Sequence, residues 1–270
     1  MKIVIIGAGG VIGNAFYRAF SQRFPGCLGL TTRNHPFLTT VRYDAASLRE
    51  YIVVADVIVY CIGVSKFAEC EQHPEKSIFL NAQLPQQILK QLSGEQTLVY
   101  FSSPIAIYDF GAAPVCAYAR HKRMAEENLR QENVLVIRPS KVIESMKIIH
   151  DWKTTLGHGR KITAYADQSI SPVNTALLSE QLDRLIRGKL TGVYNFSACD
   201  RLSYLDLAKA LCAYLKFDPG SIHVKSARQD NPFFFEQDVL DCSAAEKKIG
   251  YVPPLSKDVA NGYIQTLYEK

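Results

Sequence analysis

The sequence predicts an α/β protein, in which a doubly wound parallel sheet is followed by a smaller C-terminal α+β lobe. Short, continuously apolar runs such as Lys2–Ile6 are typical of strands covered on both faces, as in a parallel sheet. Amphipathic stretches of helical period alternate with these runs over the first half of the chain. Beyond about residue 140 this regular alternation fades.

The elements of the first half follow from local patterns. Apolar or β-branched runs predict strands at 2–6, 27–30, 42–43, 56–62, 97–101 and 134–137. Apolar side chains that recur on one face predict helices at 14–23, 84–92 and 118–130. Pro85 suits the first turn of its helix better than the interior.

The second half predicts fewer elements, and residues 152–161 are polar and interrupted by glycine, so no element is expected there. Capping-box patterns predict that helices begin at Ser203 and Ser243. The other expected elements are helices at 177–186 and from about 256, and a strand at 192–196. We expect a dinucleotide-binding domain over 1–140 and a substrate-binding lobe over 141–270, and leave open whether the chain crosses back to the first domain.

Composition excludes several classes of protein. The 270 residues are 47% hydrophobic and 21% charged, which excludes a mainly disordered chain, and no apolar run approaches the roughly 18 residues of a membrane span. The net charge of +5 comes without a basic block, so we expect no nucleic-acid partner. Seven cysteines without a C-x-x-C pair favour reduced thiols and no metal site. A cytoplasmic protein is expected, because the start is too soon broken by glycine for a signal peptide.

A glycine loop joins the first strand to the first helix, in the order Gly7-Ala8-Gly9-Gly10-Val11-Ile12-Gly13. Glycine allows the tight turn, the approach of the backbone to a pyrophosphate and close packing of helix on strand, while the helix N-terminus offers free N–H groups. A plain glycine turn is the alternative, but the strand before and helix after favour a Rossmann-type dinucleotide site. The expected cofactor-binding residues of this loop are Gly7, Gly9, Gly10, Val11, Ile12 and Gly13.

The end of the second strand indicates which dinucleotide is bound. An NAD site usually has a carboxylate there, about 20 residues beyond the loop, whereas this chain has Thr31-Thr32-Arg33. A guanidinium can grip a 2′-phosphate with two hydrogen bonds. Thr32 and Arg33 therefore favour NADP(H) over NAD(H), although a solvated surface arginine is the alternative.

Tyr118 and Lys122 lie at positions i and i+4 of a predicted helix and so share one face. A tyrosine with its ordinary pKa near 10 is a poor proton donor, but a neighbouring ammonium lowers that pKa. The pair is therefore a candidate for protonating a carbonyl oxygen that receives a hydride. An accidental helical pair is the alternative, since the spacing alone is common.

Together these motifs resemble the extended short-chain dehydrogenase/reductase family, in its dTDP-4-dehydrorhamnose reductase-like branch that modifies nucleotide sugars. The matching stretches are GAGGVIG (7–13), DVIVYCIG (56–63), NA (81–82), LVYFSS (98–103), IYD (107–109), YARHK (118–122) and IRPS (137–140). Looser echoes continue to residue 251 in ISPVN (170–174), GVYNFSA (192–198) and LDCSAAEKKIGY (240–251). The resemblance spans nearly the whole chain.

The resemblance implies roles for individual residues. Tyr118 would be the acid/base, and Lys122 would hold the nicotinamide ribose. The other implied cofactor residues are Asp44 beside the adenine, Cys61, Ile62 and Gly63 at the end of the fourth strand, Asn81 on the next helix, and Arg138 and Pro139 near the nicotinamide.

Two positions depart from the family pattern. The catalytic serine or threonine would fall on Pro104, which has no hydroxyl, so Ser103 is the candidate substitute. Related reductases have an aromatic residue near Lys141, and the lysine suggests more anionic substrate contacts.

Phe233–Phe235 favours a core or dimer interface over a ligand stack, and a homodimer is one oligomeric state that the sequence allows.

The leading hypothesis is an NADP(H)-dependent reductase of a keto group on a nucleotide-activated sugar. A nucleotide-sugar epimerase is the nearest alternative enzyme, although Thr31–Arg33 counts against it because such epimerases mostly prefer NAD. A non-catalytic NADP-binding regulatory protein or subunit of the same fold is the alternative of another class, which Pro104 favours and the Tyr118–Lys122 pair opposes.

Overall fold

The computed structural model describes residues 1–108, 116–230 and 239–268. The chain forms two compact units, the first made of Met1–Arg138 with Ser179–Tyr194 and the second of Pro139–Leu178 with Asn195–Lys270. The chain thus returns to the first unit before it completes the second. Within the described ranges, no helix is both long and apolar enough to cross a membrane.

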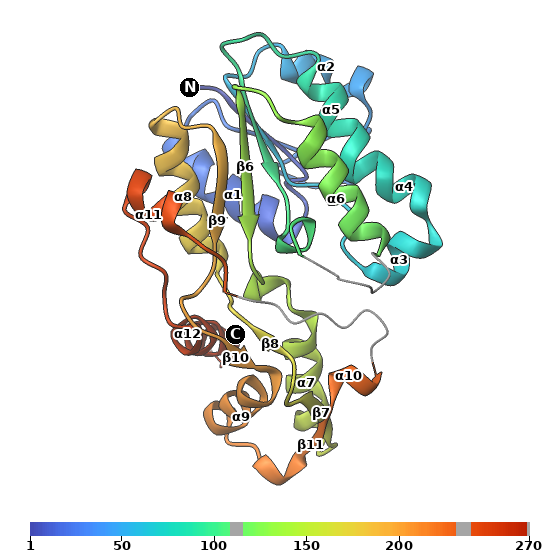
Figure 1. The fold of residues 1–270 in the computed structure, drawn as a ribbon, viewed down its shortest axis with the longest axis vertical. Coiled ribbons are helices and arrows are strands. Elements are labelled where there is room, and N and C mark those ends of the chain that lie inside the picture. The colour runs from blue at the N-terminus through green and yellow to red at the C-terminus, as the bar shows by residue number, and fades with distance from the viewer. Residues whose placement is uncertain (109–115, 231–238, 269–270) are drawn as a thin grey trace. The chain divides into compact units, whose positions relative to one another are not determined.

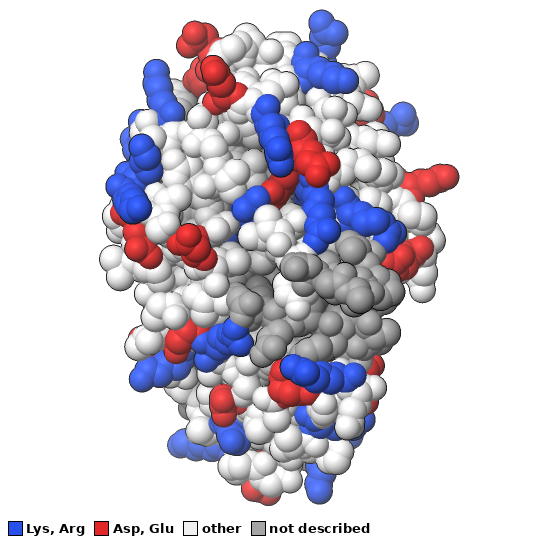
Figure 2. All heavy atoms as spheres, in the orientation of Figure 1, with Lys and Arg blue, Asp and Glu red and all other residues white. Residues whose placement is uncertain are grey.

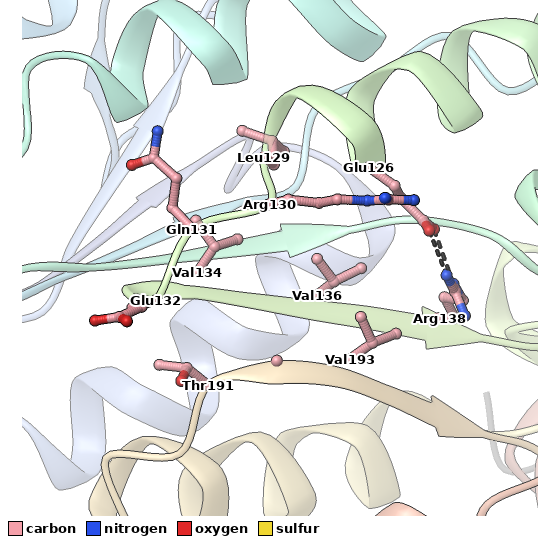
Figure 3. Close-up of a pocket in the computed structure, with 11 residues that line it drawn as sticks. Glu126, Leu129, Arg130, Gln131, Glu132, Val134, Val136, Arg138, Thr191 and Val193 are labelled. Atoms are coloured by element: carbon pink, nitrogen blue, oxygen red, sulfur yellow. Dashed lines mark hydrogen bonds and ion pairs between the residues drawn. The ribbon is translucent and has the colours of Figure 1, made fainter.

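The first unit is built on a seven-stranded sheet in the order β3-β2-β1-β4-β5-β6-β9. The strands are β1 (Ile3–Ile6), β2 (Leu28–Thr31), β3 (Thr39–Thr40), β4 (Val57–Tyr60), β5 (Thr97–Phe101), β6 (Val134–Pro139) and β9 (Gly192–Phe196). The pairings among β1 to β6 are all parallel, and β9 runs beside β6 in the same direction (Figure 3). The predicted doubly wound parallel sheet is therefore confirmed.

Helices cover both faces of this sheet (Figure 1). The helices are α1 (Val11–Arg23), α2 (Ala45–Ile52), α3 (Phe67–Gln72), α4 (Pro74–Ile78), α5 (Leu84–Leu89), α6 (Ala117–Asn128) and α8 (Thr175–Arg187), with a π turn at Phe79–Gln83 between α4 and α5. On one face, α1 lies beside α8, where Arg23 pairs with Asp183 at 3.2 Å. The other face carries α2, α5 and α6.

The strands of the sheet are buried because apolar side chains on both faces pack against helices. Phe16 and Phe20 of α1 are fully buried, and the Phe16 ring lies 5.1 Å from that of Phe101 on β5. On the other face Leu48 of α2 and Ile88 of α5 join one cluster with the strands. Burial of each such side chain stabilises the folded state by about 1.5 to 3 kcal/mol. The well-packed sheet therefore holds the loops at its carboxyl edge in fixed positions.

The second unit is a smaller α+β assembly. Its helices are α7 (Lys147–Gly157), α9 (Tyr204–Leu215), α10 (Ala227–Asp230), α11 (Ser243–Ile249) and α12 (Ser256–Tyr268), and its strands are β7 (Ile162–Tyr165), β8 (Ser169–Ile170), β10 (Leu202–Ser203) and β11 (Ile222–Lys225). Strands β7 and β11 pair in parallel, and β8 and β10 pair antiparallel. Trp152, Leu211 and Ile264 belong to its apolar core.

Three sequence-based expectations about elements differ from the structure. The third strand lies at Thr39–Thr40 rather than 42–43, because Thr39 and Thr40 pair with β2 and Val41 N–H donates to Thr31 O. The first helix begins at Val11, directly after the glycines, rather than at residue 14. Residues 152–161 are not without structure, since α7 extends to Gly157 and buries Trp152. Phe233–Phe235 and Asp109 lie outside the described residues.

Candidate functional site

The glycine loop is shaped by contacts that leave no space for side chains. Gly7 has a φ of +96°, and a Cβ atom on it would lie 2.8 Å from Ile62 Cγ2. A Cβ on Gly13 would lie 2.2 Å from Gly7 O, so α1 can pack on the loop only with glycine at this position. A Cβ on Gly9 would lie 2.5 Å from Thr31 Oγ1. The tight turn and close packing expected of a pyrophosphate loop are therefore present.

The first turn of α1 follows this loop directly. Gly10 is the N-cap and offers no side-chain hydrogen bond to the helix. The first N–H groups of a helix have no partner within it, so those of Val11 and Ile12 face outward at the positive end of the helix dipole. Val11 is exposed. This arrangement fits an anion such as a pyrophosphate.

The turn after β2 is fixed by its own hydrogen bonds. Arg33 N–H donates to Thr31 Oγ1 at 3.2 Å, and Thr40 Oγ1 donates to Arg33 O at 3.2 Å. The Thr32 and Arg33 side chains are exposed. Burial raises the pKa of Tyr43, and the neighbouring Thr31 side chain and Thr32 backbone oppose that rise. The turn therefore holds an arginine at the place where a 2′-phosphate is expected.

Asp44 has a structural role that the sequence did not predict. Its carboxylate caps α2, with Oδ1 accepting from Ser47 N–H at 2.8 Å and Oδ2 accepting from Ser47 Oγ at 2.9 Å. These hydrogen bonds lower the pKa of Asp44. The contact with an adenine that the resemblance implies for Asp44 stays a prediction.

The end of β4 meets the helix that carries Asn81. A Cβ on Gly63 would lie 2.5 Å from Asn81 Oδ1. The fully buried Asn81 amide accepts from Val64 N–H at 3.2 Å and donates to Val64 O at 2.9 Å, so it ties the segment after β4 to the helix. Burial raises the pKa of the Cys61 thiol, which keeps it neutral. Cys61 and Ile62 lie half-buried beside Gly63 on this same segment.

Tyr118, Lys122 and Ser103 lie together at the carboxyl edge of β5. Tyr118 is in the first turn of α6, and the Ser103 side chain lies close enough to the Tyr118 hydroxyl to lower its pKa. Lys122 Nζ donates to Phe101 O at 2.7 Å and to Tyr100 Oη at 3.0 Å. The Lys122 Nζ atom lies 6.0 Å from the centre of the Tyr118 ring. The structure thus brings together the three residues predicted for catalysis.

The protonation of this pair differs from the simple expectation. Burial lowers the pKa of Lys122 to about 7, opposed chiefly by the charge of Glu126. Burial raises the pKa of Tyr118 to about 12, and the hydrogen bond from Ser103 opposes that rise. The expected lowering of the Tyr118 pKa by Lys122 is absent here, because the lysine is itself desolvated and only partly charged near neutral pH. Tyr118 is therefore held as the protonated donor.

Arg138, near the end of β6, is held by an ion pair. Its Nε donates to Glu126 Oε1 at 2.8 Å and its Nη2 to Glu126 Oε2, while Ser102 Oγ also donates to this carboxylate. The pair lies at one end of a hollow of about 550 Å³, beside the floor formed by Val134, Val136 and Val193 (Figure 3). Of the predicted site residues, this hollow includes Arg138 alone.

Pro139 is the last residue of β6 and the first of the second unit, and Lys141 follows two residues later. Burial lowers the pKa of Lys141. The nicotinamide contact of Pro139 stays a prediction, as does a substrate contact of Lys141. Figure 2 shows basic and acidic side chains interspersed over the coloured part of one face, so the net positive charge does not gather there in one patch.

Comparison with known proteins adds to this geometry. A family model described as RmlD substrate binding domain matches residues 1–267. The chain belongs to this family. A curated relative, the dTDP-4-dehydrorhamnose reductase of Mycolicibacterium smegmatis, is 23% identical over 241 residues, which are 82% of this chain and 71% of that protein.

Solved structures resemble this RmlD-family chain over nearly its whole length. A dTDP-4-dehydrorhamnose reductase from Bacillus anthracis in complex with NADP matches with a TM-score of 0.83 at 16% identity, over 98% of this chain and 99% of that one. The dTDP-glucose 4,6-dehydratase DesIV from Streptomyces venezuelae, with NAD bound, matches with a TM-score of 0.79 at 19% identity, over 100% and 98%. These likenesses establish the fold.

Proposed function

We propose that the chain is an NADP(H)-dependent reductase of a keto group on a nucleotide-activated sugar. The observation that carries the proposal is the placement of Ser103, Tyr118 and Lys122 together, at the sheet edge where the glycine loop also lies. The curated relative from Mycolicibacterium smegmatis is a dTDP-4-dehydrorhamnose reductase, which agrees with this reading of the site. The Bacillus anthracis relative binds NADP, in line with the cofactor that Thr32 and Arg33 favour.

The residues fit a dinucleotide cofactor. The loop is a cradle that a Cβ atom on Gly7, Gly9 or Gly13 would fill, and the first N–H groups of α1 lie beside it without a side-chain cap. We assign the pyrophosphate to this loop, the 2′-phosphate to Thr32 and Arg33, and the nicotinamide ribose to Lys122. Asp44, Cys61, Ile62, Gly63, Asn81, Arg138 and Pro139 are proposed to line the same cofactor. When bound, the reduced nicotinamide supplies a hydride.

The chain's own residues supply the proton. A carbonyl carbon that gains a hydride leaves negative charge on its oxygen, and Tyr118 can donate its phenolic proton to that oxygen. Ser103 would bind the same carbonyl oxygen and stabilise the developing charge. The phenolate left on Tyr118 then regains a proton from water, while Lys122 would hold the nicotinamide ribose. The product is an alcohol on the sugar ring.

Substrate specificity is proposed only as a class. The second unit would bind the nucleotide sugar, with Lys141 facing an anionic group of it. A cytoplasmic location and a homodimer stay predictions.

The direct test is to follow the loss of NADPH absorbance with a panel of nucleotide-activated 4-keto-6-deoxy sugars. The proposal expects consumption of one NADPH for each sugar reduced. An epimerase would convert its substrate without net consumption of NADPH. Tight NADPH binding without any conversion would favour the non-catalytic alternative and contradict the proposal.

A further inference from the structure

The helix that carries Asn81 widens by one residue just before Pro85. Leu84 N–H donates to Phe79 O across this π turn, instead of to Leu80 O as in a regular α-helix. The regular partner of Asn81 O would be the N–H of Pro85, which proline lacks. Two consecutive carbonyl groups, those of Leu80 and Asn81, are therefore deprived of their ordinary helical donors.

Two tyrosines from neighbouring strands replace those donors. Tyr60 on β4 and Tyr100 on β5 are directly paired in the sheet, and their ring centres lie 6.1 Å apart. Tyr60 Oη donates to Leu80 O at 2.6 Å, and Tyr100 Oη donates to Asn81 O at 2.7 Å. Both rings are buried, and each hydroxyl satisfies a helix carbonyl, in a fully buried hydrogen bond at Asn81 and a partly buried one at Leu80.

The two tyrosines differ in one contact. Tyr100 Oη also accepts from Lys122 Nζ at 3.0 Å, and the same Nζ lies 4.6 Å from the centre of the Tyr100 ring. For Tyr60, the described part of the chain records no contact with Lys122. Because the Tyr100 proton is committed to Asn81 O, its oxygen presents a lone pair to the ammonium. The acceptor for Lys122 is thus fixed in direction by a carbonyl on another element.

We propose that Tyr100 is a positioning residue, which holds the Lys122 ammonium at the site through the chain Lys122–Tyr100–Asn81 carbonyl. The role of Lys122 toward the cofactor ribose rests on the proposed function, whereas the hydrogen-bond chain does not. Phe101 O, the other acceptor of Lys122, is a neighbouring backbone group whose direction is set by the strand. Tyr100 therefore supplies the second of two fixed contacts that orient the ammonium.

Several other titratable groups face Lys122 and would shift its protonation as well. They are Tyr118 and Glu126 on α6, Cys70 on α3 and Cys61 after β4. A useful experiment must remove the Tyr100 hydroxyl and leave these groups in place. Tyr100→Phe does so, and Tyr60→Phe is its matched control, because it deletes a partly buried hydrogen bond to the adjacent carbonyl from the paired position on β4.

The test is to titrate Lys122 by NMR in the full-length, cofactor-free chain, through the ¹³Cε signal assigned with Lys122→Arg. Loss of an acceptor destabilises the ammonium, so Tyr100→Phe is expected to lower the pKa of Lys122 by about 1, while Tyr60→Phe leaves it unchanged. With NADPH and sugar, Tyr100→Phe is expected to lower kcat/KM roughly tenfold more than Tyr60→Phe does. Both variants keep an aromatic ring at position 100 for the contact with Lys122 Nζ.

Should Tyr100→Phe fail to fold, 3-fluorotyrosine can be placed at position 100, where it keeps the shape of the ring and weakens the oxygen as an acceptor. We expect this substitution also to lower the pKa of Lys122. Equal titration of Lys122 in the Tyr100 and Tyr60 variants would overturn the inference, whether or not any sugar is reduced. Absence of turnover by the unaltered chain, with the expected Lys122 shift intact, would instead overturn the proposed function.

Discussion

The Ser103 side chain lies beside that of Tyr118 and lowers its pKa, although Pro104 occupies the position where the family pattern has its serine or threonine. Pro104 is the first residue of the short turn Pro104–Ala106, a place that suits proline, and Ser103 precedes it with extended backbone. The turn therefore displaces the hydroxyl by one residue and keeps it beside Tyr118. This relationship makes Ser103 a better candidate than the position alone suggests.

Replacing Ser103 by alanine is expected to lower kcat about 10- to 100-fold with little change in NADPH affinity, because the hydroxyl would act on the substrate oxygen. Ser102→Ala is the matched control, since the Ser102 hydroxyl donates to Glu126 instead. The measurement is steady-state kinetics on both variants. Equal losses in the two would contradict a direct role for Ser103.

Tyr118→Phe removes the proposed proton donor and keeps the ring, which packs 5.8 Å from that of Phe67. We expect turnover to fall by at least about 100-fold, while the dissociation constant of NADPH changes little. Fluorescence titration of NADPH and the rate of sugar reduction measure the two quantities. Full activity of this variant would exclude Tyr118 as the acid.

Arg33→Ala is expected to weaken NADPH binding by about tenfold or more and to leave NADH binding nearly unchanged, because only NADPH carries the 2′-phosphate. Arg18→Ala, which removes an exposed arginine from α1, is the control for a general loss of positive charge. Calorimetric titration of each variant with NADPH and with NADH measures the two affinities. An unchanged ratio of NADPH to NADH affinity would remove Arg33 from the cofactor site.

Lys122 makes the stability of the fold depend on pH. Its pKa is lowered from 10.5 to about 7, so between these values the unfolded chain binds a proton that the folded chain does not. The free energy of unfolding therefore rises with pH across this window, by up to about 1.4 kcal/mol per pH unit from this group. Lys122→Met should flatten the rise in urea unfolding followed from pH 7.5 to 9.5. An unchanged slope would show that Lys122 titrates as in the unfolded chain.

Gly13→Ala tests the packing of the cofactor loop. The added Cβ would lie 2.2 Å from Gly7 O, so the variant is expected to lose about 1 to 3 kcal/mol of unfolding free energy and to bind NADPH more weakly. Gly262→Ala, in the exposed part of α12, meets no atom within 4 Å and is expected to gain about 0.5 to 1 kcal/mol. Thermal unfolding measures the stability of both variants. Equal stability of the two would contradict the close contact between Gly13 and Gly7.

The parallel sheet was predictable because its signals are local. A continuous apolar run such as the one that ends at Ile6 indicates a strand that is buried on both faces. The glycines at 7, 9 and 13 are needed because their contacts leave no space for a Cβ atom. The weak third strand was misplaced because two residues carry little periodicity. The sequence does not predict helix α7 because polar residues separate its buried Ile149, Trp152 and Leu156, and Gly157, which ends the helix, suggests an interruption.

The candidate site was predictable only where spacing along one element fixes neighbours. Tyr118 and Lys122 share a helix, so their proximity follows from the sequence. The contact of Ser103 with Tyr118 depends on the geometry of a turn, and that of Tyr100 with Lys122 on the register of two strands. Pro85 was the available signal for Tyr100, since a proline within a helix implies carbonyl groups in need of another donor.

The central claim is that hydride passes from NADPH to a keto carbon of a nucleotide-activated sugar. The most direct measurement uses NADPH deuterated at the transferable position of C4, with a nucleotide-activated 4-keto-6-deoxy sugar, and mass spectrometry of the product. The account predicts one deuterium in each product molecule and one NADPH oxidised for each, with both lost in Tyr118→Phe. A product without deuterium, or unchanged sugar beside tightly bound NADPH, would contradict it.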